Sequence, residues 1–103
     1  MPWSARARIG KADMDNRMRN VRLLYFAWLR EKVGTASEEV ELPASIATVA
    51  DLIDWLEQRG PQYGEAFARR EVVRAALDKV HVKPSAALGE AREIAFFPPV
   101  TGG

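Results

Sequence analysis

The sequence predicts an α+β domain in which one main helix lies across one face of a mixed β-sheet. Two observations predict this class. Short runs of branched and aromatic residues alternate in polarity, which is typical of strands, and a central stretch, residues 48–59, has helical spacing. With 103 residues, the chain fits one domain.

The first two strands are predicted before the helix. Residues 21–29 are rich in aromatic and branched side chains, which favour a strand with both faces at least partly covered. Gly34 predicts a turn. Residues 38–42 alternate between glutamate and apolar side chains, which indicates a half-buried second strand. A short link between two such runs predicts a hairpin.

The central helix has its own start and stop signals. Thr48 and Asp51 have the spacing of a capping box. Four apolar residues repeat on one face of the predicted helix: Val49, Leu52, Ile53 and Leu56. The Gly-Pro pair that follows predicts its end. Residues 62–70 are mainly polar, and we expect a loop with at most one helical turn.

Three further strands are predicted, at residues 71–77, 80–82 and 93–97. Pro98 and Pro99 end the last one, because proline cannot donate to the ladder. One helix across a mixed sheet is the simplest two-layer packing for this order. If the last strand pairs beside the first, the fold is a β-grasp (ubiquitin-like) fold.

The N-terminal segment, residues 1–20, is basic and polar. It lacks the apolar middle of a secretory signal. It could be a disordered tail, a weak organelle-targeting peptide or residues upstream of the true start. Met18 lies close before the first predicted strand. A tail or a misplaced start is therefore favoured over a targeting peptide. We expect a disordered tail over residues 1–20 and a β-grasp domain over residues 21–103.

Composition restricts the function. The net charge of +1 gives no argument for nucleic acid or an acidic membrane, and no segment reaches the ~20 apolar residues of a membrane span. The chain has no cysteine, which excludes disulfides, thiolate nucleophiles and thiolate metal sites. These features are compatible with the cytoplasm, where we expect the protein to act.

Few side chains suggest catalysis. His81 is the only histidine, and an acid–base role needs an oriented partner, so a surface or structural role is favoured. One histidine without cysteine makes a metal site unfavourable, and we expect none. Acidic residues recur on one side of the predicted helix: Asp51, Asp54 and Glu57. We interpret them as a solvated face of the helix. The pair at positions 69–70, Arg-Arg, also reads as solvated.

The chain end is the strongest candidate site: Pro98, Pro99, Val100, Thr101, Gly102 and Gly103. The prolines stiffen the exit from the sheet, and the glycines can thread a narrow channel because they lack side chains. Such an end fits into the active site of another protein. The alternative is a frayed terminus.

A terminal carboxylate is ionised and inert as an electrophile at neutral pH. Activation by ATP to an acyl-adenylate would make its carbonyl reactive. Sulfur could then replace the adenylate and leave a thiocarboxylate, or an amine could replace it and leave a conjugated modifier. The sequence permits both reactions.

Two stretches resemble a known family. Residues 94–103, Ile-Ala-Phe-Phe-Pro-Pro-Val-Thr-Gly-Gly, are similar to the C-terminal signature of the molybdopterin synthase small subunits, the MoaD-like sulfur carriers of the ThiS/MoaD ubiquitin-like superfamily. Residues 21–27, with Arg30-Glu31 and Val33-Gly34 after them, resemble the first strand and turn of that family. The likeness covers residues 21–103.

The resemblance implies a β-grasp fold and a sulfur-carrying Gly103. An E1-like enzyme would use ATP to adenylate Gly103, which would become a thiocarboxylate. The tail would enter the active site of a synthase large subunit and deliver sulfur to cyclic pyranopterin monophosphate, for molybdenum cofactor biosynthesis. The complex would be a heterotetramer, a two-protein sulfurtransferase whose small subunit binds no cofactor and is not catalytic alone.

By the same resemblance, Phe26, Arg30 and Phe97 lie near the partner. One of the two adjacent phenylalanines at 96 and 97 must face away from the other, so at least one could be core, and Arg30 could simply be solvated. Asp78 stands where the family has asparagine before the middle turn, which should tolerate the change. Three alternatives remain: a thiamine-pathway (ThiS-like) sulfur carrier, a ubiquitin-like protein modifier, and a β-grasp interaction domain.

Overall fold

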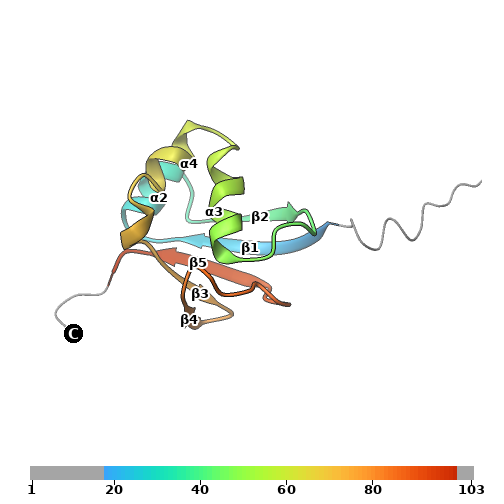
Figure 1. Cartoon of the computed structure of the whole chain (residues 1–103). Coiled ribbons are helices and arrows are strands. Elements are labelled where there is room, and N and C mark those ends of the chain that lie inside the picture. Colours follow the sequence, from blue (N-terminus) through green and yellow to red (C-terminus); the bar gives the residue numbers. More distant parts are fainter. Residues whose placement is uncertain (1–17, 100–103) are drawn as a thin grey trace, which may run out of the picture.

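The computed structural model describes residues 18–99, which form one sheet with helices on one face (Figure 1). Within this range no helix is long and apolar enough to cross a membrane. In chain order the elements are β1 (Arg19–Tyr25), α2 (Trp28–Val33), β2 (Ser37–Leu42), α3 (Val49–Glu57), α4 (Pro61–Ala66), the 3-10 turn η2 (Arg70–Val72), β3 (Arg74–Leu77), β4 (Val80–Val82) and β5 (Glu93–Phe97).

The five strands lie in the order β2-β1-β5-β3-β4. β1 and β5 are parallel neighbours, with Tyr25 opposite Phe96, and all other pairs are antiparallel. Parallel neighbours need a crossover, which carries α3 over the sheet. The last strand therefore pairs beside the first, as the β-grasp prediction requires. β1 begins at Arg19, so the sheet includes two residues that we assigned to the N-terminal segment; residues 1–17 lie outside the described part.

The prediction of a strand over residues 21–29 is wrong at its end. β1 stops at Tyr25, Ala27 turns the backbone at φ 55°, and α2 follows. The apolar run suits a helix here because Leu29 is fully buried and the Trp28 indole N–H donates to the Ala66 carbonyl in α4, 3.2 Å away. The hairpin pairing of β1 with β2 is confirmed, with α2 inserted between them.

The prediction for α3 is confirmed apart from its last residues. The Thr48 hydroxyl accepts from the Asp51 N–H, and the Asp51 carboxylate accepts from the Thr48 N–H, which is the predicted capping box. The four apolar residues of the predicted stripe are all buried. They pack the helix onto the face of the sheet where Tyr25 and Phe96 point.

Two segments after α3 differ from the prediction. The predicted loop contains the helix α4, whose first residue is Pro61 and which buries Tyr63 and Ala66. The predicted strand over residues 71–77 begins only at Arg74, because η2 precedes it. The Arg70 guanidinium ties η2 to α3 through Asp54, at 2.7 Å, and Glu57, at 2.8 Å. These three residues are therefore paired rather than simply solvated.

A shared carboxylate joins the sheet to the helical layer. The hydroxyls of Tyr25 and Tyr63 both donate to Oε2 of Glu38, at 2.8 and 2.7 Å. The Arg59 guanidinium approaches the same oxygen at 3.4 Å and lies over the Tyr63 ring. Burial, and then the hydrogen bond to Glu38, raise the pKa of Tyr25 and raise the pKa of Tyr63 to about 12.

We expect this cluster to make the fold sensitive to alkali. A tyrosine whose pKa is higher in the folded state than the unfolded value of about 10 stabilises the fold fully below pH ~10, and that stability is lost as the pH rises through 12. Tyr63→Phe should therefore flatten the fall in the free energy of unfolding above pH ~10, by about 2 kcal/mol at pH ~11.5. Urea unfolding at pH 8 to 11.5 measures it; parallel curves for wild type and variant would contradict it.

Candidate functional site

The root of the C-terminal tail lies where β1 and β5 end side by side. Because these strands are parallel, their carboxyl ends share one edge of the sheet, and the chain leaves β5 there through Pro98 and Pro99, both half-buried. The predicted site residues Val100, Thr101, Gly102 and Gly103 lie outside the described residues. The structure thus shows where the tail starts.

The two phenylalanines before the tail have opposite roles, as the alternation of a strand predicts. Phe96 is fully buried, its ring stacked on Tyr25 with centroids 6.2 Å apart and edge-on to Phe67 at 5.0 Å. Phe97 faces the other side of the sheet, away from the helices, and is half-buried. Core packing by Phe96 therefore holds Phe97 at the root of the tail.

Apolar side chains gather on the outer face of the sheet around Phe97. Phe26 is 47% exposed, and its backbone N–H donates to the Phe96 carbonyl at 3.1 Å, so it lies beside the end of β5. Leu24 and Ala95 are opposite each other in the ladder and point the same way. We call these four residues, Leu24, Phe26, Ala95 and Phe97, the outer-face patch. Exposed apolar surface of this kind is typical of protein interaction sites.

Arg30 lies on α2, which follows Phe26 at the same end of the sheet. Its side chain is exposed and forms no ion pair or side-chain hydrogen bond with residues 18–99. Gly34, at φ 99°, ends α2 in the left-handed conformation that glycine favours. The three residues predicted to meet a partner thus come to the end of the sheet where the tail begins.

His81 lies on the outer face of the sheet beside Phe97, a position that the sequence did not predict. It pairs with Ala76 across the β3–β4 hairpin, and its ring reaches over that small residue to Phe97, with centroids 4.9 Å apart. The contact explains why Ala76 is only 6% exposed on the outer face. Asp78 and Lys79 form the hairpin turn with positive φ, so Asp78 occupies the turn as predicted. The approach of His81 to Phe97 could not be predicted because it depends on the register in which β4 pairs with β3.

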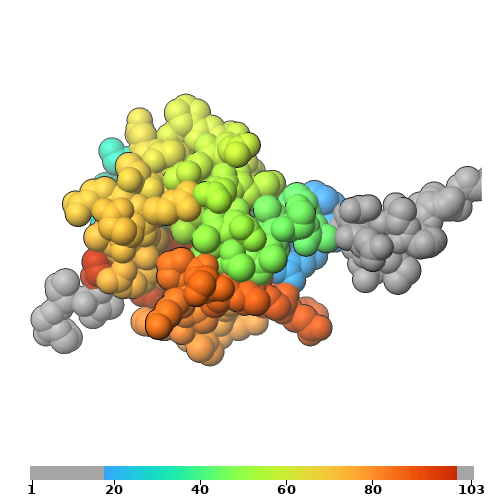
Figure 2. All heavy atoms as spheres, in the orientation of Figure 1, coloured from blue at the N-terminus to red at the C-terminus, as the bar shows by residue number. Residues whose placement is uncertain are grey.

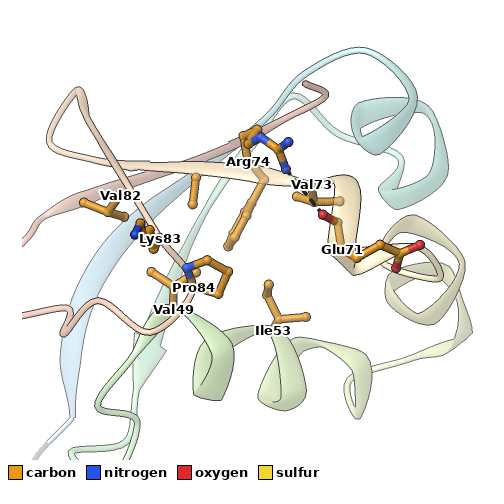
Figure 3. Close-up of a pocket in the computed structure, with 10 residues that line it drawn as sticks. Val49, Ile53, Glu71, Val73, Arg74, Val82, Lys83 and Pro84 are labelled. Atoms are coloured by element: carbon orange, nitrogen blue, oxygen red, sulfur yellow. Dashed lines mark hydrogen bonds between the residues drawn. The ribbon is translucent and has the colours of Figure 1, made fainter. Parts of the chain in front are cut away.

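The described residues form no evident catalytic centre. A cavity of about 200 Å³ opens between α3 and β3, where Val49 and Ile53 point into it (Figure 3). Its lining holds no histidine or hydroxyl side chain. Within residues 18–99 no three His, Asp or Glu side chains gather as a metal site would need. On the face shown in Figure 2, the helical layer forms a continuous surface.

A parallel central strand pair, flanking antiparallel strands and a helix packed across them define a ubiquitin-like β-grasp protein. Comparison with solved structures agrees: SAMP1 from Haloferax volcanii superposes with a TM-score of 0.61 at 26% identity, over 82% of this chain and 100% of that one. The predicted fold class is confirmed.

Sequence comparison identifies the family. The family model of the ThiS family matches residues 23–103, and the chain belongs to this family. It is 36% identical to the molybdopterin synthase sulfur carrier subunit of Mycobacterium tuberculosis, over 84% of this chain and 100% of that protein. It is 35% identical to the protein of that name in Escherichia coli, over 81% of this chain and 99% of that protein.

Proposed function

We propose that this chain is the sulfur carrier subunit of a molybdopterin synthase, with the carboxyl group of Gly103 as the sulfur-bearing site. The observation that carries the proposal is the similarity to sulfur carrier subunits over most of their length. The structure adds support, because a partly exposed apolar patch lies at the root of the tail that would enter the partner.

The proposed chemistry starts at an unreactive group. A carboxylate oxygen of Gly103 attacks the α-phosphate of ATP on an E1-like enzyme, and pyrophosphate leaves. Sulfur at the oxidation level of sulfide then attacks the acyl carbon, and the C–O bond to AMP breaks. The product is a thiocarboxylate, whose sulfur can attack a carbon of the cyclic pyranopterin monophosphate held by the large subunit, while a carbon–oxygen bond at that carbon breaks. Hydrolysis of the bond between the sulfur and the acyl carbon would then leave the sulfur on the substrate and restore the Gly103 carboxylate. These reactions would take place in the cytoplasm, which supplies the ATP for the adenylation step.

The large subunit would supply the catalytic side chains. This chain would contribute the tail, while the outer-face patch and Arg30 bind the partner. Burial of Phe26 and Phe97 against an apolar surface would fix the tail in the partner's active site, since large aromatic side chains contribute strongly to binding. The two proteins together would form the sulfurtransferase, and a heterotetramer of two small and two large subunits is the expected assembly.

A protein modifier is the second candidate. The chain resembles SAMP1, a protein described as a small archaeal modifier protein, at 26% identity. In that function a lysine amine attacks the acyl carbon of the Gly103 adenylate, AMP leaves, and an isopeptide bond forms. A sulfur carrier for thiazole formation is the third, because the family takes its name from ThiS.

Reconstitution distinguishes the three candidates. The thiocarboxylated chain, the large subunit and cyclic pyranopterin monophosphate should together yield molybdopterin, and omission of either protein should stop the reaction. Formation of lysine conjugates with no molybdopterin would favour the modifier. Sulfur transfer to a thiazole-forming enzyme, with none to the large subunit, would favour the third candidate.

A further inference from the structure

The outer face carries cationic side chains on the β3–β4 side of Phe97. Arg74 is paired with Phe97 in the ladder, and the next residue, Ala75, belongs to the core, so Arg74 stands on the outer side. Lys83 directly follows β4, two residues after His81, at the edge of the sheet, and both Lys83 and Arg74 also line the cavity beside α3 (Figure 3). Both cationic side chains are exposed. With His81 they form what we call the basic corner: Arg74, His81 and Lys83.

The two cations of the basic corner form no ion pair in the described part of the chain, although Glu71 lines the same cavity as both of them. Neither Arg74 nor Lys83 forms an ion pair with a carboxylate of residues 18–99. The Arg74 guanidinium donates only to the backbone carbonyl of Glu71, at 3.3 Å (Figure 3). The Glu71 carboxylate pairs with Arg69 instead, and Asp78 accepts from two backbone N–H groups at the start of β5.

We propose that the basic corner receives a carboxylate-bearing surface of the large subunit and so fixes the orientation of docking. This inference rests on the proposed function. An apolar patch contributes affinity but discriminates little between orientations, whereas fixed charges at one side favour one orientation and reject partners with like charge. Arg74 and Lys83 lie beyond β5 on the side opposite β1 and Arg30, so cations flank the patch on both sides.

Salt-dependent binding tests the inference. The full chain and the large subunit from the same genome are titrated by calorimetry at about 50 and 500 mM NaCl. Arg74→Gln/Lys83→Gln should weaken binding about tenfold at low salt and less than about twofold at high salt, because salt screens exposed charges. Arg22→Gln/Arg92→Gln, the control, removes the same number of exposed cations from the other end of the sheet, one of them paired with Glu39, and should change affinity less than about twofold.

The outcomes separate the inference from the proposed function. Equal affinities for the Arg74/Lys83 variant and the control at low salt would overturn the basic corner, while wild-type binding would still support the docking of a sulfur carrier. A loss that is equally large at both salt concentrations would also overturn it, because the effect would not be electrostatic. Failure of the wild-type chain to bind the large subunit would overturn both.

Discussion

Removal of Gly103 should abolish sulfur transfer and leave the fold unchanged. The loss should be complete, because Gly102 would present its carboxyl group one residue short of the partner's reacting centre, and even a displacement of about 1 Å from the reacting geometry can cost 100-fold in rate. The free energy of unfolding should stay within about 0.5 kcal/mol of wild type, since surface changes away from the core have small effects.

The measurement is molybdopterin formation by the reconstituted complex, with urea unfolding alongside. Thr101→Ser is the matched control, because it changes the tail but keeps its length and its terminal glycines. The control should retain activity. If the chain without Gly103 forms molybdopterin at the wild-type rate, Gly103 is not the sulfur-bearing residue.

Substitutions of the two adjacent phenylalanines should have different effects, one on folding stability and the other on binding to the large subunit. Phe96→Ala removes a fully buried ring that contacts Tyr25 and Phe67, and should cost about 3–5 kcal/mol, a large part of the stability of a small domain. Phe97→Ala removes a half-buried ring from the outer face, and should cost about 1 kcal/mol or less in folding.

For binding to the large subunit, the Phe97→Ala variant should be at least about tenfold weaker than wild type, as expected when a central aromatic side chain is truncated. Urea unfolding and calorimetric titration of the same preparations give both quantities. Val80→Ala is a control for exposed apolar surface, because Val80 is 63% exposed and lies on the face of β4 opposite to His81 and Phe97. Unchanged affinity of Phe97→Ala would remove the outer-face patch from the docking surface.

The sequence predicted the elements whose signals are local and unambiguous. The capping residues and apolar stripe of α3 specify a helix by themselves, and the alternation of β2 specifies a half-buried strand. The secondary structure around Leu29 could not be predicted from such local signals. Its apolar run suits either a strand or a helix, and the decision comes from tertiary packing of Trp28 on α4. Helix α4 was missed because its six residues bury only Tyr63 and Ala66.

The candidate site was predictable in part. Chain order and alternation indicated that Phe96 and Phe97 face opposite sides, and the structure shows which one is core. The approach of His81 to Phe97 depends on the register of β4 and on the small size of Ala76, which no local pattern encodes. The basic corner likewise arises from two strands that only the sheet order brings together with β5.

The intact mass of the chain tests the proposed sulfur site most directly. After incubation with ATP, a cognate E1-like enzyme and a sulfide source, the mass should rise by the difference between one sulfur and one oxygen, and fragmentation should place the change on the last residue. A chain that keeps its original mass under conditions that convert a known sulfur carrier, or that gains sulfur anywhere other than at Gly103, would contradict the proposal.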